Sequence, residues 1–235
     1  MKLLLTSSGI SNPSIDAALV GLLGKPITES SALIVPTGIY PFPSGAQGAW
    51  RAISGNAQSP FAELGWNSLG VLELTSLTSI QEDSWVPMLK ETDVLYVWGG
   101  NVMYLSYWMK QSGLASLLPS LNELVYVGCS AGSIVTTPYN CDAESNLKVV
   151  PSGSEIALEG EGALGFVNFA LSVHLDNPNP IFEDHSVANV AKWAAGMSVP
   201  TYAIDDETAI KVTNGTVEVV SEGHWKLFAP RAAGD

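Results

Sequence analysis

Short, continuous apolar runs recur along this sequence, and they constrain its fold more than any other feature. Turn residues bound each run, so each has the length of a single strand. Because the runs are continuous rather than alternating, they predict strands buried on both faces, as in a parallel sheet covered by helices. Segments of helical length separate them, which predicts an α/β fold with a single doubly wound, mostly parallel sheet and helices on both faces. The expected strands span residues 2–5, 31–35, 71–74, 94–98 and 125–127, and the expected helices span residues 14–23, 46–65, 81–90, 102–118 and 187–195.

The C-terminal part of the chain follows a different pattern. Residues 208–213 and 216–220 are typical of strands, and the Asn-Gly pair between them is typical of a two-residue type I′ turn. These residues predict a C-terminal β-hairpin, and a further strand is expected at residues 225–228. The irregular stretch 136–165 is expected to surround an active site rather than to link two domains. With 235 residues, the chain is expected to form one α/β domain over residues 1–235.

Charge and cysteine content exclude several classes of protein. The sequence has 23 acidic residues against 10 lysines and arginines, a net charge of −13. This balance argues against nucleic-acid binding, which needs clustered cations. The two cysteines, Cys129 and Cys141, are too few for a disulfide framework, and no Cys/His spacing indicates a zinc site. We therefore expect neither a metal nor another cofactor.

No hydrophobic segment has the length that a secretory signal or a membrane span needs. The N-terminal apolar run stops at Thr6, far short of the apolar region of a signal peptide. No other run approaches the roughly 18 apolar residues of a membrane-spanning helix. We therefore expect a soluble, cytoplasmic protein without membrane contacts.

Residues 128–132, Gly-Cys-Ser-Ala-Gly, form a G-x-S-x-G motif between a predicted strand and an apolar helical stretch. A nucleophile elbow needs this context, because small flanking residues let the backbone turn sharply and present the serine hydroxyl at the carboxyl edge of the sheet. The motif alone also fits an ordinary turn between a strand and a helix. We expect Ser130 to be a nucleophile, which requires a general base nearby.

The chain has three histidines, so the search for that base is short. His174 ends an apolar run and precedes an Asp/Asn/Pro loop, which predicts a place at the carboxyl end of a strand, on the same edge as the elbow. His185 lies in a polar loop, and His224 lies between the predicted hairpin and the last strand. Position favours His174 as the base, with the other two as alternatives.

Acidic residues that could orient the base occur in two places. Asp142 and Glu144 lie between the serine motif and the favoured histidine. The second group is consecutive and precedes the predicted hairpin. Three adjacent acids are usually a solvated turn, but one buried carboxylate among them could hold the tautomer of the base and stabilise its imidazolium. This second group consists of Asp205, Asp206 and Glu207.

A second glycine-containing turn follows the predicted strand 94–98. Gly99 and Gly100 are followed by Asn101, at the start of a predicted helix. Backbone N–H groups at such a turn can point at a developing oxyanion, and glycine permits a close approach. The N–H groups of Gly100 and Ala131 would form a two-donor oxyanion hole. Gly99 and Asn101 would then contact the substrate. A bare turn with an asparagine cap explains these residues equally well.

These motifs, in this order, resemble those of the dipeptidase E and cyanophycinase family of serine peptidases, whose fold is similar to that of class I glutamine amidotransferases. The resemblance covers most of the chain. In order, the segments that carry it are LLLTSSG, like the family's first strand and loop; YVWGGN, like its GGGN turn; VGCSAG, like its nucleophile motif; LSVHLDN, like its base-bearing segment; and AIDDETAIKVTNG, like its acid-bearing segment.

The resemblance implies a serine peptidase that cleaves small peptides without a cofactor, through a Ser-His-acid triad and an acyl-enzyme intermediate. Ser130 would be the nucleophile, His174 the base and Asp206 the acid, with Asp205 or Glu207 as substitutes. Asp206 falls where the family carries glutamate, so its reach is one methylene shorter. The order Ser, His, acid differs from the Ser, acid, His order of α/β-hydrolases. A monomer or a homodimer is expected.

Departures from the family bear on specificity. The segment FEDHSVANVAKWA has Lys192 but no arginine, where the family's dipeptidases carry one suited to gripping a carboxylate. Strict preference for an N-terminal aspartate is therefore not expected. Trp98 stands where the family has glycine, and Val173 where it usually has proline, and both changes would reshape the pocket.

Three alternatives remain open at this point. The first is a cyanophycinase-like hydrolase of Asp-Arg polymer, whose guanidinium groups an acidic cleft would attract. The second is a binding module that keeps the scaffold without activity. The third is Cys129 as the nucleophile. Because Cys129 precedes the nucleophile position by one residue, we expect its side chain to point into the sheet and to be unreactive.

Overall fold

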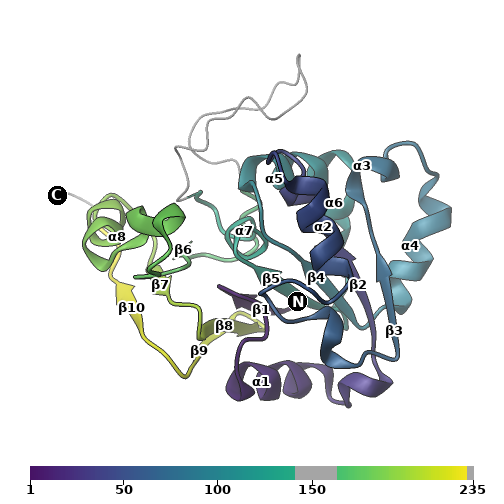
Figure 1. Cartoon of the computed structure of the whole chain (residues 1–235), viewed down its shortest axis with the longest axis horizontal. Coiled ribbons are helices and arrows are strands. Elements are labelled where there is room, and N and C mark those ends of the chain that lie inside the picture. The colour runs from purple at the N-terminus through teal and green to yellow at the C-terminus, as the bar shows by residue number, and fades with distance from the viewer. Residues whose placement is uncertain (141–162, 232–235) are drawn as a thin grey trace.

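The chain folds around a seven-stranded sheet and a smaller three-stranded sheet (Figure 1). The computed structural model describes residues 1–140 and 163–231. The large sheet contains β1 (Lys2–Thr6), β2 (Ser31–Val35), β3 (Ser68–Val71), β4 (Val94–Val97), β5 (Val125–Cys129), β8 (Thr208–Thr213) and β9 (Thr216–Ser221). Its strand order is β3-β2-β4-β5-β1-β8-β9. The first five strands of this order run parallel, whereas β8 and β9 are antiparallel to their neighbours. The predicted mostly parallel sheet with a C-terminal hairpin is confirmed.

Helices cover both faces of the large sheet. The side chains of β1 alternate between two apolar clusters, with Leu3 and Leu5 in one and Leu4 in the other. The four inner parallel strands, β1, β2, β4 and β5, are thus buried on both faces, which explains their continuous apolar sequences. In the described residues, no helix is both long and apolar enough to span a bilayer. The α-helices are α1 (Pro13–Leu23), α2 (Gly45–Ile53), α3 (Leu74–Leu77), α4 (Glu82–Glu91), α5 (Val102–Gln111), α6 (Leu114–Leu117), α7 (Ala131–Ile134) and α8 (Val187–Ala194), and the 3-10 helices are η1 (Ile27–Glu29), η2 (Thr37–Ile39), η3 (Ala62–Leu64), η4 (Leu118–Ser120) and η5 (Pro180–His185).

The smaller sheet brings together strands that are distant in the sequence. It contains β6 (Ala170–Ser172), β7 (Thr201–Ile204) and β10 (Trp225–Phe228), in the order β10-β7-β6. β6 and β7 are parallel, and β10 is antiparallel to β7. The strand expected at residues 225–228 is therefore present, and it belongs to this second sheet. Figure 1 shows the small sheet beside α8, next to the hairpin of the large sheet.

One predicted strand is displaced along the chain. The strand expected at residues 71–74 is β3, which spans Ser68–Val71. β3 is an edge strand with mostly exposed side chains, so it carries little apolar signal. The apolar residues after it enter α3, whose first turn is capped by Glu73 through the N–H of Thr75.

Two predicted helices are shorter than expected. The helix expected at residues 46–65 ends at Ile53, and Gly55 follows in the left-handed region with φ 72°. The helix expected at residues 102–118 is divided between α5 and α6, because Gly113 has φ 80°. In both places a glycine leaves the helical conformation at no steric cost, so the apolar pattern continues where the helix does not.

Candidate active site

The G-x-S-x-G motif forms a sharp turn between β5 and α7. Ser130 has φ 53° and ψ −117°, a conformation that costs a residue other than glycine about 1–3 kcal/mol. Close packing maintains it: a Cβ at Gly128 would lie 2.6 Å from the carbonyl oxygen of Gly132. A Cβ at Gly132 would overlap the carbonyl oxygen of Val97. The two glycines therefore let α7 lie directly against β5 and β4, and Ser130 lies in the strand–turn–helix context that the motif predicts.

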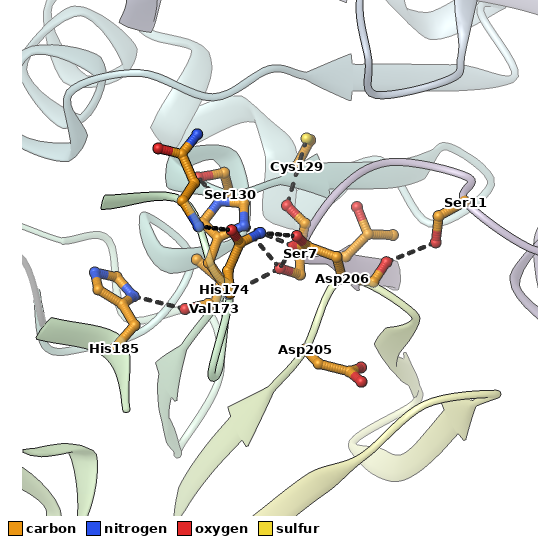
Figure 2. Close-up of polar contacts among 12 residues, drawn as sticks. Ser7, Ser11, Cys129, Ser130, Val173, His174, His185, Asp205 and Asp206 are labelled. Atoms are coloured by element: carbon orange, nitrogen blue, oxygen red, sulfur yellow. Dashed lines mark hydrogen bonds and ion pairs between the residues drawn. The ribbon is translucent and has the colours of Figure 1, made fainter. Parts of the chain in front are cut away.

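His174 lies beside the hydroxyl of Ser130, as Figure 2 shows. It follows β6, and its Nε2 lies 3.0 Å from Ser130 Oγ, within the reach that a general base needs. The imidazole stacks on the ring of Phe182, with centroids 4.0 Å apart and planes 20° apart. His174 itself has φ 57°, so, like Ser130, it occupies a strained backbone position.

Asp206 lies on the opposite side of the imidazole from Ser130, two residues after the end of β7. Its Oδ1 lies 2.6 Å from His174 Nδ1 and accepts a hydrogen bond from Ser7 Oγ at 2.6 Å. Its Oδ2 accepts a hydrogen bond from Asn177 Nδ2 at 2.5 Å. Partial burial would raise the pKa of Asp206, but the hydrogen bonds and the charge of His174 outweigh it and lower that pKa. The ionised carboxylate holds a proton on Nδ1 and leaves the Nε2 lone pair facing Ser130.

The two acids adjacent to Asp206 contact other groups. Asp205 accepts hydrogen bonds from Thr208 Oγ1 at 2.6 Å and from the N–H of His224 at 2.6 Å, so it holds the turns on either side of the hairpin. Glu207 Oε2 accepts a hydrogen bond from Asn12 at 3.1 Å. Of the three consecutive acids, Asp206 is the one placed against His174.

Several sequence candidates lie outside the described residues. They include most of the stretch 136–165 that was expected to surround the site. The other candidates in this part of the chain are Asp142, Glu144 and Cys141.

The other two histidines contact groups away from Ser130. His185 Nδ1 donates a hydrogen bond to the carbonyl oxygen of Val173 at 2.6 Å. His224 pairs with two carboxylates, that of Asp205 at 2.9 Å and that of Asp176 at 3.3 Å. Of the three histidines, His174 is the one whose imidazole lies beside Ser130, and its position after a strand had favoured it in the sequence.

Cys129 is buried, with 2% of its surface exposed. Its Sγ lies 3.7 Å from the carbonyl oxygen of Ser7. Burial is the main cause that raises the pKa of the thiol, which keeps it protonated at neutral pH. A buried, protonated thiol is a poor nucleophile, so the geometry favours Ser130 over its neighbour.

The second glycine turn lies against the elbow. A Cβ at Gly99 would lie 3.2 Å from the Cβ of Ser130. Gly100 has φ 133°, and a Cβ there would overlap the carbonyl oxygen of Gly38, so glycine alone fits this position. Among the described residues, no carbonyl group accepts a hydrogen bond from the N–H groups of Gly99, Gly100 or Ala131. These donors are available to a ligand beside Ser130.

Asn101 is a buried residue that directly follows the second glycine turn. It is 2% exposed, and its Oδ1 accepts a hydrogen bond from the N–H of Tyr104, which makes it the N-cap of α5. It is absent from the described residues that line the cleft, whereas Gly99 and Gly100 are among them. The structure thus places Asn101 as a helix cap behind the turn.

A cleft of about 330 Å³ opens beside Ser130 and His174. Its walls include the apolar side chains of Trp98 and Ile181 and the polar side chain of Gln58. No lysine or arginine is found among the described residues that line it. Within the same described part of the chain, no group of three or more His, Cys, Asp or Glu residues could hold a metal ion.

Comparison with known proteins identifies the family. A model of peptidase family S51 matches residues 3–220. The chain belongs to peptidase family S51. This confirms the resemblance predicted from the sequence motifs. An uncharacterized peptidase of Listeria monocytogenes serovar 1/2a, Lmo0363, is 30% identical over 129 residues, which make up 52% of this chain and 57% of the relative. That match spans little more than half the length of the curated relative.

Two solved structures share the fold of this S51 member. One is a candidate peptidase E from Listeria monocytogenes EGD-e, with a TM-score of 0.63 and 20% identity over 94% of this chain and 98% of that one. The other is a peptidase from an acI-B1 Actinobacterium, with a TM-score of 0.63 and 18% identity over 100% of this chain and 95% of that one. At these identities the likeness concerns the fold.

Sequence reasoning missed three residues whose side chains contact the side chain of His174 or Asp206. Ser7 and Asn177 hydrogen-bond to Asp206, and Phe182 stacks on His174. The sequence could have indicated Ser7, because it directly follows a strand that ends at the same sheet edge as the turn at Ser130. Asn177 lies in a turn after β6, and Phe182 lies at a kink within η5, so no periodic pattern indicates their direction.

Proposed function

We propose that this S51 family member is a serine peptidase that hydrolyses small peptides through an acyl-enzyme intermediate. The observation that supports this most is the 3.0 Å separation of His174 Nε2 and Ser130 Oγ, on an imidazole whose Nδ1 lies 2.6 Å from Asp206. A serine hydroxyl is a weak nucleophile until a base takes its proton. This arrangement supplies both the base and the acid that orients it.

In the first half-reaction, Ser130 Oγ attacks the substrate carbonyl carbon while His174 Nε2 accepts the hydroxyl proton. The oxyanion that forms accepts hydrogen bonds from the N–H groups of Gly100 and Ala131. Asp206 stabilises the imidazolium through Nδ1. The imidazolium then donates its proton to the leaving amine as the C–N bond breaks, which leaves the acyl group on Ser130.

In the second half-reaction, water attacks the acyl-enzyme. His174 Nε2 accepts a proton from this water, and the same two N–H groups receive the second oxyanion. The imidazolium returns the proton to Ser130 Oγ as the ester bond breaks. The carboxylic acid product leaves, and the hydroxyl and the neutral imidazole are restored.

The cleft supports a small substrate without an acidic side chain. Its volume of about 330 Å³ lies at the lower end of the range of about 300–1,000 Å³ that small-molecule sites occupy. No described lysine or arginine of its lining could pair with an acidic side chain. We therefore expect dipeptides with neutral side chains to be hydrolysed faster than dipeptides that begin with aspartate.

The test is turnover of a panel of dipeptides, including a β-Asp-Arg dipeptide, by the wild-type protein and by Ser130→Ala. We expect Ser130→Ala to lose turnover while its circular dichroism spectrum is unchanged. Ser133→Ala is the matched control, because Ser133 lies three residues after Ser130 but is buried and donates its hydrogen bond to the carbonyl oxygen of Thr6. Hydrolysis retained by Ser130→Ala would exclude Ser130 as the nucleophile. No hydrolysis by the wild-type protein would favour a binding module.

A further inference from the structure

We propose that Ser7 is a positioning residue that holds the base and the acid of this site in register with the nucleophile. The inference rests on the proposed function, because it assigns Ser7 to the same reaction. Ser7 directly follows β1, and its exposed fraction is 0%. It is therefore shielded from the substrate and acts through the residues that it contacts.

A single hydroxyl group joins the two partners, as Figure 2 shows. Ser7 Oγ accepts a hydrogen bond from the backbone N–H of His174 at 2.9 Å and donates one to Asp206 Oδ1 at 2.6 Å. It also lies 3.2 Å from His174 Nδ1. The directions of the first two bonds are fixed, because an amide only donates and a carboxylate only accepts. Ser7 thus links the backbone of the base to the side chain of the acid.

This link connects the two sheets of the molecule. His174 follows β6 and Asp206 follows β7, and both strands belong to the small sheet. Ser130 follows β5 in the large sheet, where Cys129 pairs with Thr6 of β1. Ser7 comes next after Thr6, whose carbonyl oxygen accepts a hydrogen bond from the N–H of Ser130 at 3.1 Å. Through Ser7, the large sheet that carries the nucleophile holds the loops that carry the base and the acid.

Both partners need such support. His174 is in the left-handed region at φ 57°, where a residue other than glycine persists only if its surroundings hold it. Ser7 accepts the N–H of this strained residue in a buried setting, where an unpaired donor is costly. The hydrogen bond from Ser7 is also one of the causes that lower the pKa of Asp206. Ser7 therefore fixes the place of the base and favours the charged form of the acid.

The test compares Ser7→Ala, Ser7→Cys and Ser133→Ala with the wild-type protein. We expect Ser7→Ala to lower kcat by about 10- to 100-fold, as misplacement of a catalytic group does, with KM within about two-fold. Ser7→Cys nearly preserves the volume but is a weak hydrogen-bond donor, so it should lose activity as Ser7→Ala does. A cysteine variant with wild-type kcat would show that Ser7 acts by filling space, and would overturn the inference. Ser133→Ala should keep kcat within about three-fold.

A second readout does not depend on turnover. Titration of the Asp206 carboxyl carbon by NMR should show a higher pKa in Ser7→Ala than in the wild-type protein, because a donor to the carboxylate is lost. An unchanged pKa together with an unchanged kcat would overturn the inference. If the wild-type protein hydrolyses no peptide, the proposed function fails, and the NMR titration still decides whether Ser7 holds Asp206.

Discussion

Substitution of Gly128 by alanine tests whether packing of α7 on β5 positions Ser130. The new Cβ would lie 2.6 Å from the carbonyl oxygen of Gly132 and 2.7 Å from the amide nitrogen of Ser133. Both are backbone atoms, so no side-chain rotation relieves the overlap. Since real Cβ contacts are essentially never shorter than 3.0 Å, α7 must move away from β5 by at least 0.4 Å. This movement shifts Ser130, which lies between the two elements.

The size of the effect follows from this movement. Overpacking of this kind destabilises a fold by about 1–3 kcal/mol. A displacement of about 1 Å at a reacting group costs about 100-fold in rate, so a shift of about half that size should lower kcat/KM by about 10-fold or more. Urea denaturation measures the first effect, and dipeptide hydrolysis under conditions where the variant is folded measures the second.

Gly21→Ala is the matched control for Gly128→Ala. Gly21 lies within α1, and a Cβ there would meet no atom within 4 Å. Because alanine favours the helix more than glycine does, this control should be stabilised by up to about 1 kcal/mol, with unchanged activity. Gly128→Ala with wild-type stability and wild-type kcat/KM would refute the view that backbone packing at the elbow places Ser130.

Three further predictions concern the acid and the thiol. Asp206→Asn should lower kcat by about 10³- to 10⁴-fold, since an amide no longer holds the required tautomer of His174. Asp205→Asn should lower the free energy of unfolding more than it lowers the activity per folded molecule. A larger kcat loss in Asp205→Asn than in Asp206→Asn would show that Asp205 is the acid. The lowered pKa of Asp206 means that its carboxylate contributes stability above the unfolded-state value near 3.8 and loses that contribution as pH falls through the lower folded-state pKa. The stability difference between the wild-type protein and Asp206→Asn in urea denaturation should therefore shrink in acid, and a difference that grows there would contradict this sign. Iodoacetamide should leave Cys129 unmodified in the folded protein, and rapid alkylation with loss of activity would make the thiol the nucleophile.

The parts of the fold that the sequence predicted are those in which local pattern and tertiary burial agree. The inner parallel strands are buried on both faces, so their continuous apolar runs mark them directly. β3 escaped this pattern because an edge strand exposes its side chains, as Leu69 and Val71 do. The small sheet was missed as a unit because its three strands are short and their pairing joins segments far apart in the chain.

The candidate site was predictable where a residue ends a strand. Ser130 and His174 both follow strands, and strand ends that meet at one edge bring such residues together. The choice among Asp205, Asp206 and Glu207 was not predictable from pattern, because adjacent residues in a turn point in different directions. The resemblance to the family selected Asp206, and the 2.6 Å separation from His174 agrees with that selection.

Reaction with a fluorophosphonate, followed by peptide mass spectrometry, tests the central claim most directly. The account predicts a single adduct on Ser130 at one label per chain, formed rapidly by the wild-type protein and at least about 100-fold more slowly by His174→Ala, because the base then cannot take the hydroxyl proton. An adduct on another residue, or no adduct on the folded wild-type protein, would contradict it.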